Sequence, residues 1–309
     1  MTVGFFVSRA QEEVDDGSAA FFDAYASVRR FYRDVQDWTG LDADQLLAGE
    51  LPEHHATRNA ALAIRSIAGQ LAVHDVLGEA GVRPDAILAL SLGITSASCM
   101  VGSLSREQMF RMLWHRRRIP DLPAGEPAQG VALCIEQPGQ DRTRFYQGRD
   151  DVYLAVDFGR VSDGSRWAVL TGYKAALQEL AAQEPEAIMV MERGTAAVHS
   201  PLRRHASDFV RAHVETLDVK DPLVPLAACL GPHALTTADE VREAIWRNLV
   251  VTASIPDGLA ATTALGVTVL VVPGPSMADN MVEFPVPVVR VKVPGDVAEA
   301  VDAVREALG

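Results

Sequence analysis

The sequence predicts an α/β protein built from two structural units, and three observations lead to this prediction. Apolar runs of strand length alternate with stretches of helical length through most of the chain. A segment rich in proline and glycine, residues 121–127, interrupts the alternation and is typical of a linker. Beyond it, strand-length runs follow one another without a long helix between them, which favours a small antiparallel sheet.

Taken in order, the segments before the linker predict strands at residues 3–7 and 86–90, and helices at 18–28, 60–77, 94–102 and 106–116. After the linker come strands at 130–136, 152–158, 166–171 and 187–191, with one helix at 172–183. The chain then returns to the first unit with helices at 201–214, 238–248 and 296–307, and strands at 223–228, 267–272 and 288–293.

Length and composition are those of a globular protein. The chain has 309 residues, of which 48% are hydrophobic and 22% are charged, so it can bury a large core. No uninterrupted apolar run reaches the roughly 18 residues of a membrane span. The first residues lack the basic flank and long apolar region of a signal peptide and are interpreted as a strand. We therefore expect no membrane partner and a cytoplasmic location.

Charge and cysteine content narrow the function classes further. The formal net charge of −13 argues against a nucleic-acid partner, because such proteins normally present a basic face. Cys99, Cys134 and Cys229 show neither the spacing of metal ligands nor a disulfide framework. Their neighbours are apolar, so we expect buried thiols and no metal site.

The most informative segment is Ala89-Leu90-Ser91-Leu92-Gly93, which lies between an expected strand and an expected helix. A serine at a sharp strand-to-helix turn has the pattern of a nucleophile elbow. The turn exposes the hydroxyl and places backbone N–H groups where developing negative charge is stabilised. Small residues are needed two positions before and after the serine. A match of this kind also occurs in ordinary loops, so context must decide.

The context is a series of motifs in a particular order. A helix at 60–71 precedes the elbow, and Arg116 follows Ser91 after 25 residues. Phe-Val-Ser-Arg-Ala-Gln at 6–11, Ala-Ala-Val-His-Ser-Pro at 196–201 and Val-Pro-Gly-Pro-Ser at 272–276 complete the series. In these motifs the chain resembles the malonyl-CoA:ACP transacylase family and the acyltransferase domains of polyketide synthases, over nearly its whole length.

The resemblance implies a fold and a division of the chain. It implies a large α/β-hydrolase-like subdomain with a parallel sheet, formed by residues 1–127 and 197–309, and a small ferredoxin-like α+β subdomain at residues 128–196.

The resemblance also implies the catalytic residues. Ser91 would be the nucleophile and His199 the base; among the eight histidines, His199 alone stands just before an expected helix start, with Ser200 and a proline as cap and first turn. The backbone N–H groups of Gln11 and Leu92 would hold the oxyanion. No third triad member is expected, because family members orient the ring with backbone carbonyls. The alternatives are a capping or core histidine at 199 and an ordinary turn residue at 11.

Substrate contacts follow in the same way. Arg116 would pair with the free carboxylate of a malonyl-type group, since a guanidinium matches a carboxylate in bidentate geometry. Arginines also occupy positions 117 and 118, so the role could belong to a neighbour. Leu90, Ala196, Val198 and Ser254 would border the acyl group. Leu90, Ile94 and Ser254, with residues 10–13 and 157–159, depart from the family pattern, which indicates an altered substrate or weakened activity.

The preferred function is a discrete, trans-acting acyltransferase of a polyketide-type secondary-metabolite (antibiotic) pathway. It would move an acyl group by ping-pong chemistry from acyl-CoA or acyl-phosphopantetheine to an acyl carrier protein, as a monomer and without a bound cofactor. Arginine-rich spots at 115–118 and 203–205 could meet the acidic carrier, although each could also be a solvated helix face. Two alternatives remain open: an enzyme that acylates a small-molecule hydroxyl or hydrolyses acyl thioesters, and a non-catalytic scaffold on the same fold.

Overall fold

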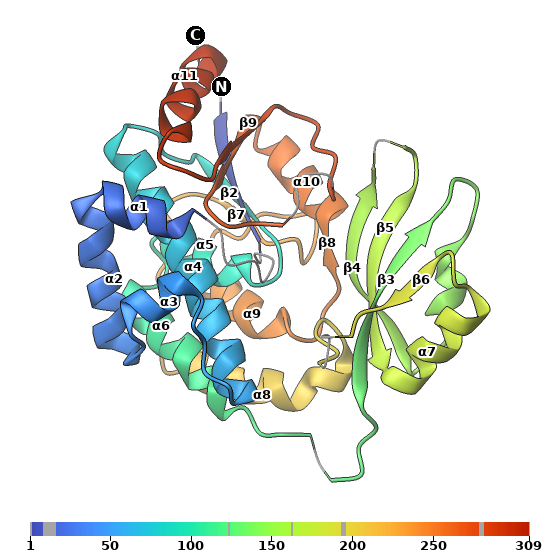
Figure 1. Ribbon diagram of the computed structural model, residues 1–309. Coiled ribbons are helices and arrows are strands. Elements are labelled where there is room, and N and C mark those ends of the chain that lie inside the picture. Colours follow the sequence, from blue (N-terminus) through green and yellow to red (C-terminus); the bar gives the residue numbers. More distant parts are fainter. Residues whose placement is uncertain are drawn as a thin grey trace.

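The chain folds as the α/β protein that the sequence predicts. The computed structural model describes residues 2–8, 17–122, 124–161, 163–192, 196–277 and 281–308. Two five-stranded sheets lie side by side, with most helices around the first sheet (Figure 1). The first sheet is built from the two ends of the chain, and the second mainly from its middle.

The first sheet is parallel, in the order β10-β9-β1-β2-β7. Its strands are β1 (Thr2–Val7), β2 (Ala86–Ala89), β7 (Leu226–Ala227), β9 (Val267–Pro273) and β10 (Val288–Val291). All four residues of β2 are buried, as expected of a parallel strand covered on both faces. Along β1, Phe5 and Phe6 enter different core clusters on opposite faces of the sheet. Val7 pairs with Ala89, so β1 and β2 end together at the carboxyl edge, where α/β proteins bind ligands.

The helices before the second sheet follow the prediction with two differences. They are α1 (Ser18–Ala24), α2 (Ala26–Thr39), α3 (Ala43–Ala48), α4 (His55–Glu79), α5 (Gly93–Met100) and α6 (Arg106–His115), followed by the 3-10 turn η1 (Arg116–Arg118). The single helix expected at 18–28 is wrong: Tyr25 is extended, with φ −118° and ψ 124°, and separates α1 from α2. The short helix α3, capped by Asp42, was not predicted.

The helices after the second sheet pack against both faces of the first sheet. They are α8 (Arg204–Val214), which follows the 3-10 turn η3 (Pro201–Arg203), α9 (Ala238–Arg247), α10 (Ile255–Ala264) and α11 (Asp296–Leu308). Residues of α9 join the core cluster that contains Phe5, whereas residues of α10 join the cluster that contains Phe6. The sequence did not predict α10.

The long helix α4 is the central helix of the large core. By length and composition it could cross a membrane. However, 78% of its most apolar 18-residue stretch is buried inside the protein. Ile64, Ile67 and Leu71 are fully buried in the main cluster. Burial on this scale is that of a core helix in a globular fold.

The second sheet is mostly antiparallel, in the order β6-β3-β5-β4-β8. Its strands are β3 (Gln129–Glu136), β4 (Val152–Arg160), β5 (Arg166–Tyr173), β6 (Ile188–Val190) and β8 (Ala253–Ser254). The helix α7 (Lys174–Gln183) covers one face, and the short 3-10 turn η2 (Arg142–Phe145) follows β3. Strand β8, which was not predicted, comes from the returning chain and pairs in parallel with β4. The division at residues 128 and 196 therefore stays a proposal, and the sheet itself crosses it.

Candidate active site

Ser91 lies on a sharp turn between β2 and α5. The backbone of Ser91 has φ 56°, in the left-handed region that non-glycine residues rarely adopt. The first residue of α5, Gly93, passes so close to β1 that a Cβ there would lie 2.2 Å from the carbonyl oxygen of Val7. This contact gives the physical reason for the small residue two positions after the serine. The hydroxyl of Ser91 is thereby held at the carboxyl edge of the first sheet.

His199 lies directly against this turn. Its Nε2 is 2.8 Å from Ser91 Oγ, and the residue is only 4% exposed. The backbone of His199 also has a positive φ, 61°, and its N–H donates to the carbonyl of Leu249 at 2.8 Å. Both members of the pair thus occupy backbone conformations that cost free energy and that surrounding contacts must hold.

Backbone carbonyls orient the imidazole ring. Nδ1 of His199 is 3.2 Å from the carbonyl oxygen of Val251, so Nδ1 carries the hydrogen and Nε2 is left to accept the serine proton. Burial lowers the pKa of His199 to about 4, although the backbone carbonyls of Val251 and Asn248 act to raise it. The ring is therefore neutral at pH 7 and can act as a base.

Asn248, at the end of α9, is a site residue to which the sequence assigned no role. Its Nδ2 donates to the carbonyl oxygen of Ser91 at 3.0 Å, and the side chain is 8% exposed. Asn248 therefore holds the backbone of Ser91 with its side chain, while its own backbone carbonyl faces His199. An asparagine after a helix carries no distinctive signal, because its partner is 157 positions away in the chain.

Ser254, which was expected to border the acyl group, caps a helix in the structure. Its side chain accepts from the N–H of Asp257 at 3.2 Å and so caps α10. The carbonyl that contacts the histidine belongs to Val251, three residues earlier. Ser200, expected as a side-chain cap, instead donates its hydroxyl to the carbonyl of Ala197 at 2.6 Å, and η3 has no side-chain cap.

One of the two expected oxyanion donors can be placed. The N–H of Leu92 stands at the start of α5 and has no acceptor within the described ranges, so it is available to a ligand. Gln11 lies outside the described residues. The buried Gln70 ties the neighbouring segments together: its Nε2 donates to the carbonyls of Ser8 and Pro275, and its Oε1 accepts from Ser96. Gln70 joins the ends of β1 and β9 to α5.

Arg116, in η1, has no counter-ion among the residues that the structure describes. The side chain as a whole is half-buried, but its Nε is fully buried and has no hydrogen-bond partner in the described part of the chain. Burial lowers the pKa of Arg116 to about 10. Arg117 differs, because it stacks over Trp114 at 4.3 Å and donates to its carbonyl at 2.7 Å. Of these two adjacent arginines, Arg116 is the one left free for an anion.

The remaining residues expected at the acyl group lie around the pair. Leu90, next to the nucleophile, is 4% exposed and belongs to the core cluster that contains Phe6. Ala196 and Val198 are half-buried, and the segment that carries them is held by Gln129, whose Oε1 accepts from the N–H of Ala197 at 2.9 Å. The surroundings of the serine and histidine are therefore largely apolar.

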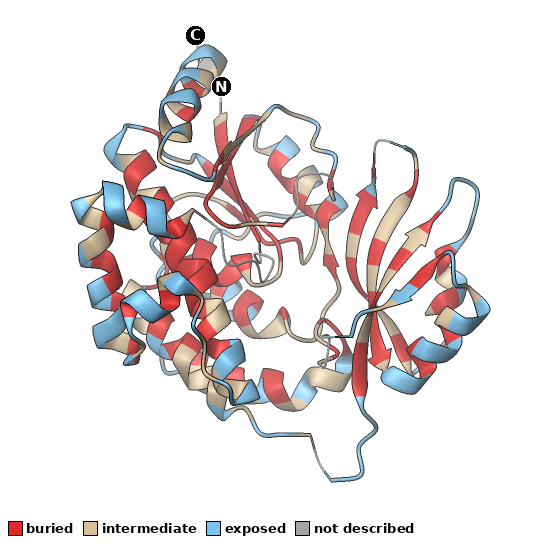
Figure 2. Ribbon diagram, in the orientation of Figure 1, coloured by how far each residue is buried: buried red, intermediate tan, exposed pale blue. Residues whose placement is uncertain are grey.

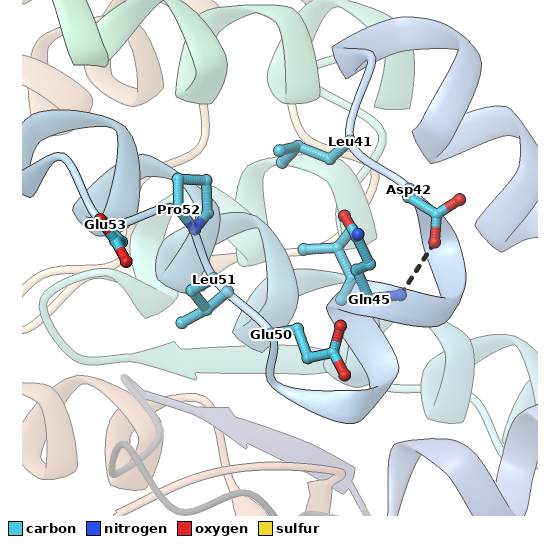
Figure 3. A pocket seen from close by; sticks show the side chains of 8 residues that line it. Leu41, Asp42, Gln45, Glu50, Leu51, Pro52 and Glu53 are labelled. Carbon is cyan, nitrogen blue, oxygen red and sulfur yellow. Dashed lines mark hydrogen bonds between the residues drawn. The ribbon is translucent and has the colours of Figure 1, made fainter.

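Other features of the surface lie away from this pair. A hollow of about 320 Å³ opens beside α3 and is lined by Leu41, Asp42, Gln45 and the segment after the helix (Figure 3). None of the expected site residues lines it. Among the described residues, no group of three or more His, Cys, Asp or Glu side chains could hold a metal ion. Cys134 and Cys229 are buried as expected, but Cys99 is only half-buried.

Comparison with known proteins gives one family throughout. The acyl transferase domain family matches residues 16–284. The chain is 30% identical over 163 residues to 5-methyl-1-naphthoate synthase of Streptomyces sahachiroi, which covers 52% of this chain and 9% of that protein. It is 22% identical over 262 residues to the malonyl CoA-acyl carrier protein transacylase of Bacillus subtilis (strain 168), covering 82% of this chain and 80% of that protein.

Solved structures show the same fold. The crystal structure of malonyl CoA-acyl carrier protein transacylase from Clostridium perfringens superposes with a TM-score of 0.86 at 16% identity, covering 99% and 98% of the two chains. A malonyl-transacylase in complex with its type II polyketide acyl-carrier protein gives 0.82 at 19% identity, covering 98% and 100%. At these identities the superpositions bear on the fold alone. The chain spans about a tenth of the first relatives' length: 9% of the 5-methyl-1-naphthoate synthase and 9% of a mycocerosic acid synthase-like polyketide synthase of Mycolicibacterium smegmatis.

Proposed function

The chain belongs to the acyl transferase domain family, and from that membership and the geometry of its serine and histidine we propose that it transfers an acyl group through an acyl-serine on Ser91. The single observation that carries the proposal is the 2.8 Å contact between Ser91 Oγ and Nε2 of a buried, neutral His199. A serine hydroxyl becomes nucleophilic only when a neighbouring base takes its proton.

The reaction runs in two half-reactions. His199 Nε2 accepts the proton as Ser91 Oγ attacks the carbonyl carbon of an acyl thioester, and the N–H of Leu92 donates to the developing oxyanion. The thiolate leaves with the proton returned by His199. The acceptor thiol then gives its proton to His199 as its sulfur attacks the acyl carbonyl carbon. The ester bond to Ser91 Oγ breaks, and His199 returns the proton to Oγ, which restores the free serine. Loss of one oxyanion donor would cost about 3–4 kcal/mol in a reaction of this type.

For the acyl group and acceptor we propose a malonyl-type substrate and an acyl carrier protein. Arg116 supports the first, because a guanidinium on a half-buried side chain, without a counter-ion in the described part of the chain, offers a bidentate site for a free carboxylate. The second rests on the relatives: one is called a malonyl CoA-acyl carrier protein transacylase, and another was solved with its acyl-carrier protein. We further propose that the domain accepts a carrier supplied as a separate protein, within a polyketide-type pathway.

A second candidate is a transferase or hydrolase for acyl groups without a carboxylate. The observation that favours it is the apolar setting of the catalytic pair, with Leu90 buried beside Ser91 and burial holding the pKa of His199 near 4. A substrate carboxylate placed in such a setting must reach Arg116 to escape the cost of desolvation.

The test is intact-protein mass spectrometry after incubation with malonyl-CoA, methylmalonyl-CoA and acetyl-CoA, using wild type and Ser91→Ala. We expect an adduct of malonyl mass on the wild type only, and its disappearance when a separate carrier protein is added. An adduct on both proteins would place the acyl group elsewhere, and no adduct from any donor would remove the transferase proposal.

Arg116→Lys and Arg117→Lys form a matched pair for the substrate. Charge-assisted bidentate bonds contribute roughly 1.5–3 kcal/mol, so Arg116→Lys should lower kcat/KM for malonyl-CoA by about 10- to 100-fold. The same change at Arg117 should have little effect, because Arg117 is occupied with Trp114. Equal losses at both positions would contradict the assignment of Arg116.

A further inference from the structure

The second sheet has one covered and one partly open face. Side chains alternate along β3, and Ala132 and Cys134 lie in the cluster under α7, together with Ile188 of β6. The opposite face carries Val131, Leu133, Ile135, Met189 and Met191, which we call the apolar strip. None of the five is assigned to a core cluster of the described residues, and Figure 2 shows the resulting alternation of buried and partly exposed bands.

Exposure of the strip is unusual for side chains of this kind. Met189 is 60% exposed and Met191 48%, and these two are among the few large hydrophobic side chains that the described surface exposes to this degree. Leu133 pairs with both Met189 and Val169, so the strip runs without a break from the edge strand β6 across β3 to β5. An apolar patch that stays open in the folded protein marks a binding surface more often than chance.

The strip begins at the segment that carries His199. Thr171 of β5 lies on the same face, opposite Val131, and its hydroxyl donates to the carbonyl of Val198 at 3.2 Å. Gln129, two residues before Val131 on the same face, binds the N–H of Ala197. The face that carries the strip therefore holds the residues immediately before the catalytic histidine, and the strip leads away from them.

On the side away from β6, the strip adjoins two residues of β5. Val169 and Trp167 of β5 pack against the core cluster that contains Leu90, the residue before the nucleophile. Trp167 pairs with Ile135 at the far end of the strip. From Val131 to Ile135 the strip is four residues long, or ~14 Å at about 3.4 Å per residue. This length suits an extended alkyl chain and far exceeds a methyl branch.

We propose that the apolar strip binds an extended alkyl chain carried on the acyl group that the enzyme transfers. The inference rests on the proposed function and specifies its substrate class: an acyl thioester whose chain runs from the carbonyl at Ser91 along Val131, Leu133 and Ile135, with Met189 beside Leu133.

The experiment measures kcat/KM for acylation of Ser91 with straight-chain acyl-CoAs from acetyl to dodecanoyl, in competition within one mixture and read by intact mass. Burial of one CH₂ changes binding by about two- to fourfold on an apolar surface, so kcat/KM should rise in steps of that size until the strip is filled. Direct binding of decanoyl-CoA and acetyl-CoA to Ser91→Ala gives a readout that does not depend on turnover.

Leu133→Asn tests the strip and Leu223→Asn is its matched control. Leu223 is 85% exposed and lies outside the second sheet, so the same substitution there should leave the chain-length series unchanged. Leu133→Asn should lower the decanoyl-to-acetyl ratio by roughly tenfold, and Met189→Asn, at an exposed position that cannot unfold the sheet, should lower it in the same direction.

The outcomes separate the two proposals. If wild type forms an acyl-serine but shows no dependence on chain length, the strip does not bind the acyl chain and only this inference fails. If Leu133→Asn weakens all donors equally, the strip contacts the pantetheine arm that they share, which also overturns it. If neither these donors nor malonyl-CoA acylates Ser91 and decanoyl-CoA still binds Ser91→Ala more tightly than acetyl-CoA, the binding surface stands and the transferase proposal fails.

Discussion

We expect His199, the proposed base, to stay deprotonated at pH values where an ordinary histidine has already been protonated. A histidine in water has a pKa of about 6.5, whereas burial lowers the pKa of His199 to about 4. At pH 5.5 the fraction of neutral imidazole is then about 97%, compared with about 9% for an unperturbed group. The rate of acyl-serine formation should therefore stay nearly flat from pH 8 to about pH 5.

The lowered pKa of His199 also makes the stability of the fold depend on pH, and stability falls as the pH falls. Between about pH 6.5 and pH 4 the unfolded chain takes up a proton at His199 that the folded chain refuses, so acid destabilises the fold in this window. The full difference corresponds to ~3 kcal/mol, lost progressively as the pH falls and constant below about pH 4. The assay must therefore confirm that the protein is folded at each pH.

The measurement is a rapid-quench series of acylation rates from pH 4.5 to 8, with circular dichroism recorded in the same buffers. Ser91→Ala supplies the background of non-enzymatic acylation. An inflection near pH 6.5 in protein that is still folded would refute the reasoning, because it would mean that His199 exchanges protons as if it were in water. If the acylation rate and the helical circular dichroism signal are lost together, the loss of rate reflects unfolding of the protein and not titration of His199 in the folded state.

Two further substitutions test what holds the catalytic pair in place. Asn248→Ala removes the donor to the Ser91 carbonyl. Because a lost hydrogen bond to a buried group costs about 1–3 kcal/mol, kcat for acylation should fall by roughly 10- to 100-fold with little change in KM. A change in KM alone would contradict a positioning role. Gly93→Ala places a Cβ 2.2 Å from Val7 O, so we expect a lower melting temperature and loss of acylation, whereas Gly78→Ala, which meets nothing within 4 Å, should affect neither. Equal melting temperatures for the two glycine variants would show that the turn can relax.

The sequence predicted most of what depends on local pattern. Strand β2 followed by Ser91 and α5 was predictable because an apolar run, a small residue and a helix start are all adjacent in the chain. The break at Tyr25 was missed because residues 18–39 carry no proline or strong turn residue at that point, and only the extended backbone of Tyr25 separates the helices. Strand β8 has two residues, too few for any periodicity, and exists only because β4 offers it an edge.

Contacts made by the backbone lie beyond the reach of sequence patterns. The resemblance implied that backbone carbonyls orient His199, but any residue type supplies a carbonyl, so the sequence could not say that it belongs to Val251. Asn248 was missed for the related reason that its partner is the carbonyl of Ser91. Conversely, the resemblance and the position before a helix start pointed to the side chain of His199, and the structure places its Nε2 2.8 Å from Ser91 Oγ.

The apolar surroundings of the pair connect its chemistry to its substrate. Burial keeps His199 neutral, and the same burial removes water from any acyl chain that lies beside Leu90 and Val169. A charged group left there would lose its hydration unless it reached a guanidinium such as that of Arg116, whose buried Nε has no hydrogen-bond partner among the described residues. On the proposed function we therefore expect an acyl group that is apolar next to Ser91 and whose carboxylate, where it has one, pairs with Arg116. A donor with both features should outcompete donors with either one, and parity between malonyl-CoA and an alkyl-branched malonyl-CoA would contradict this argument.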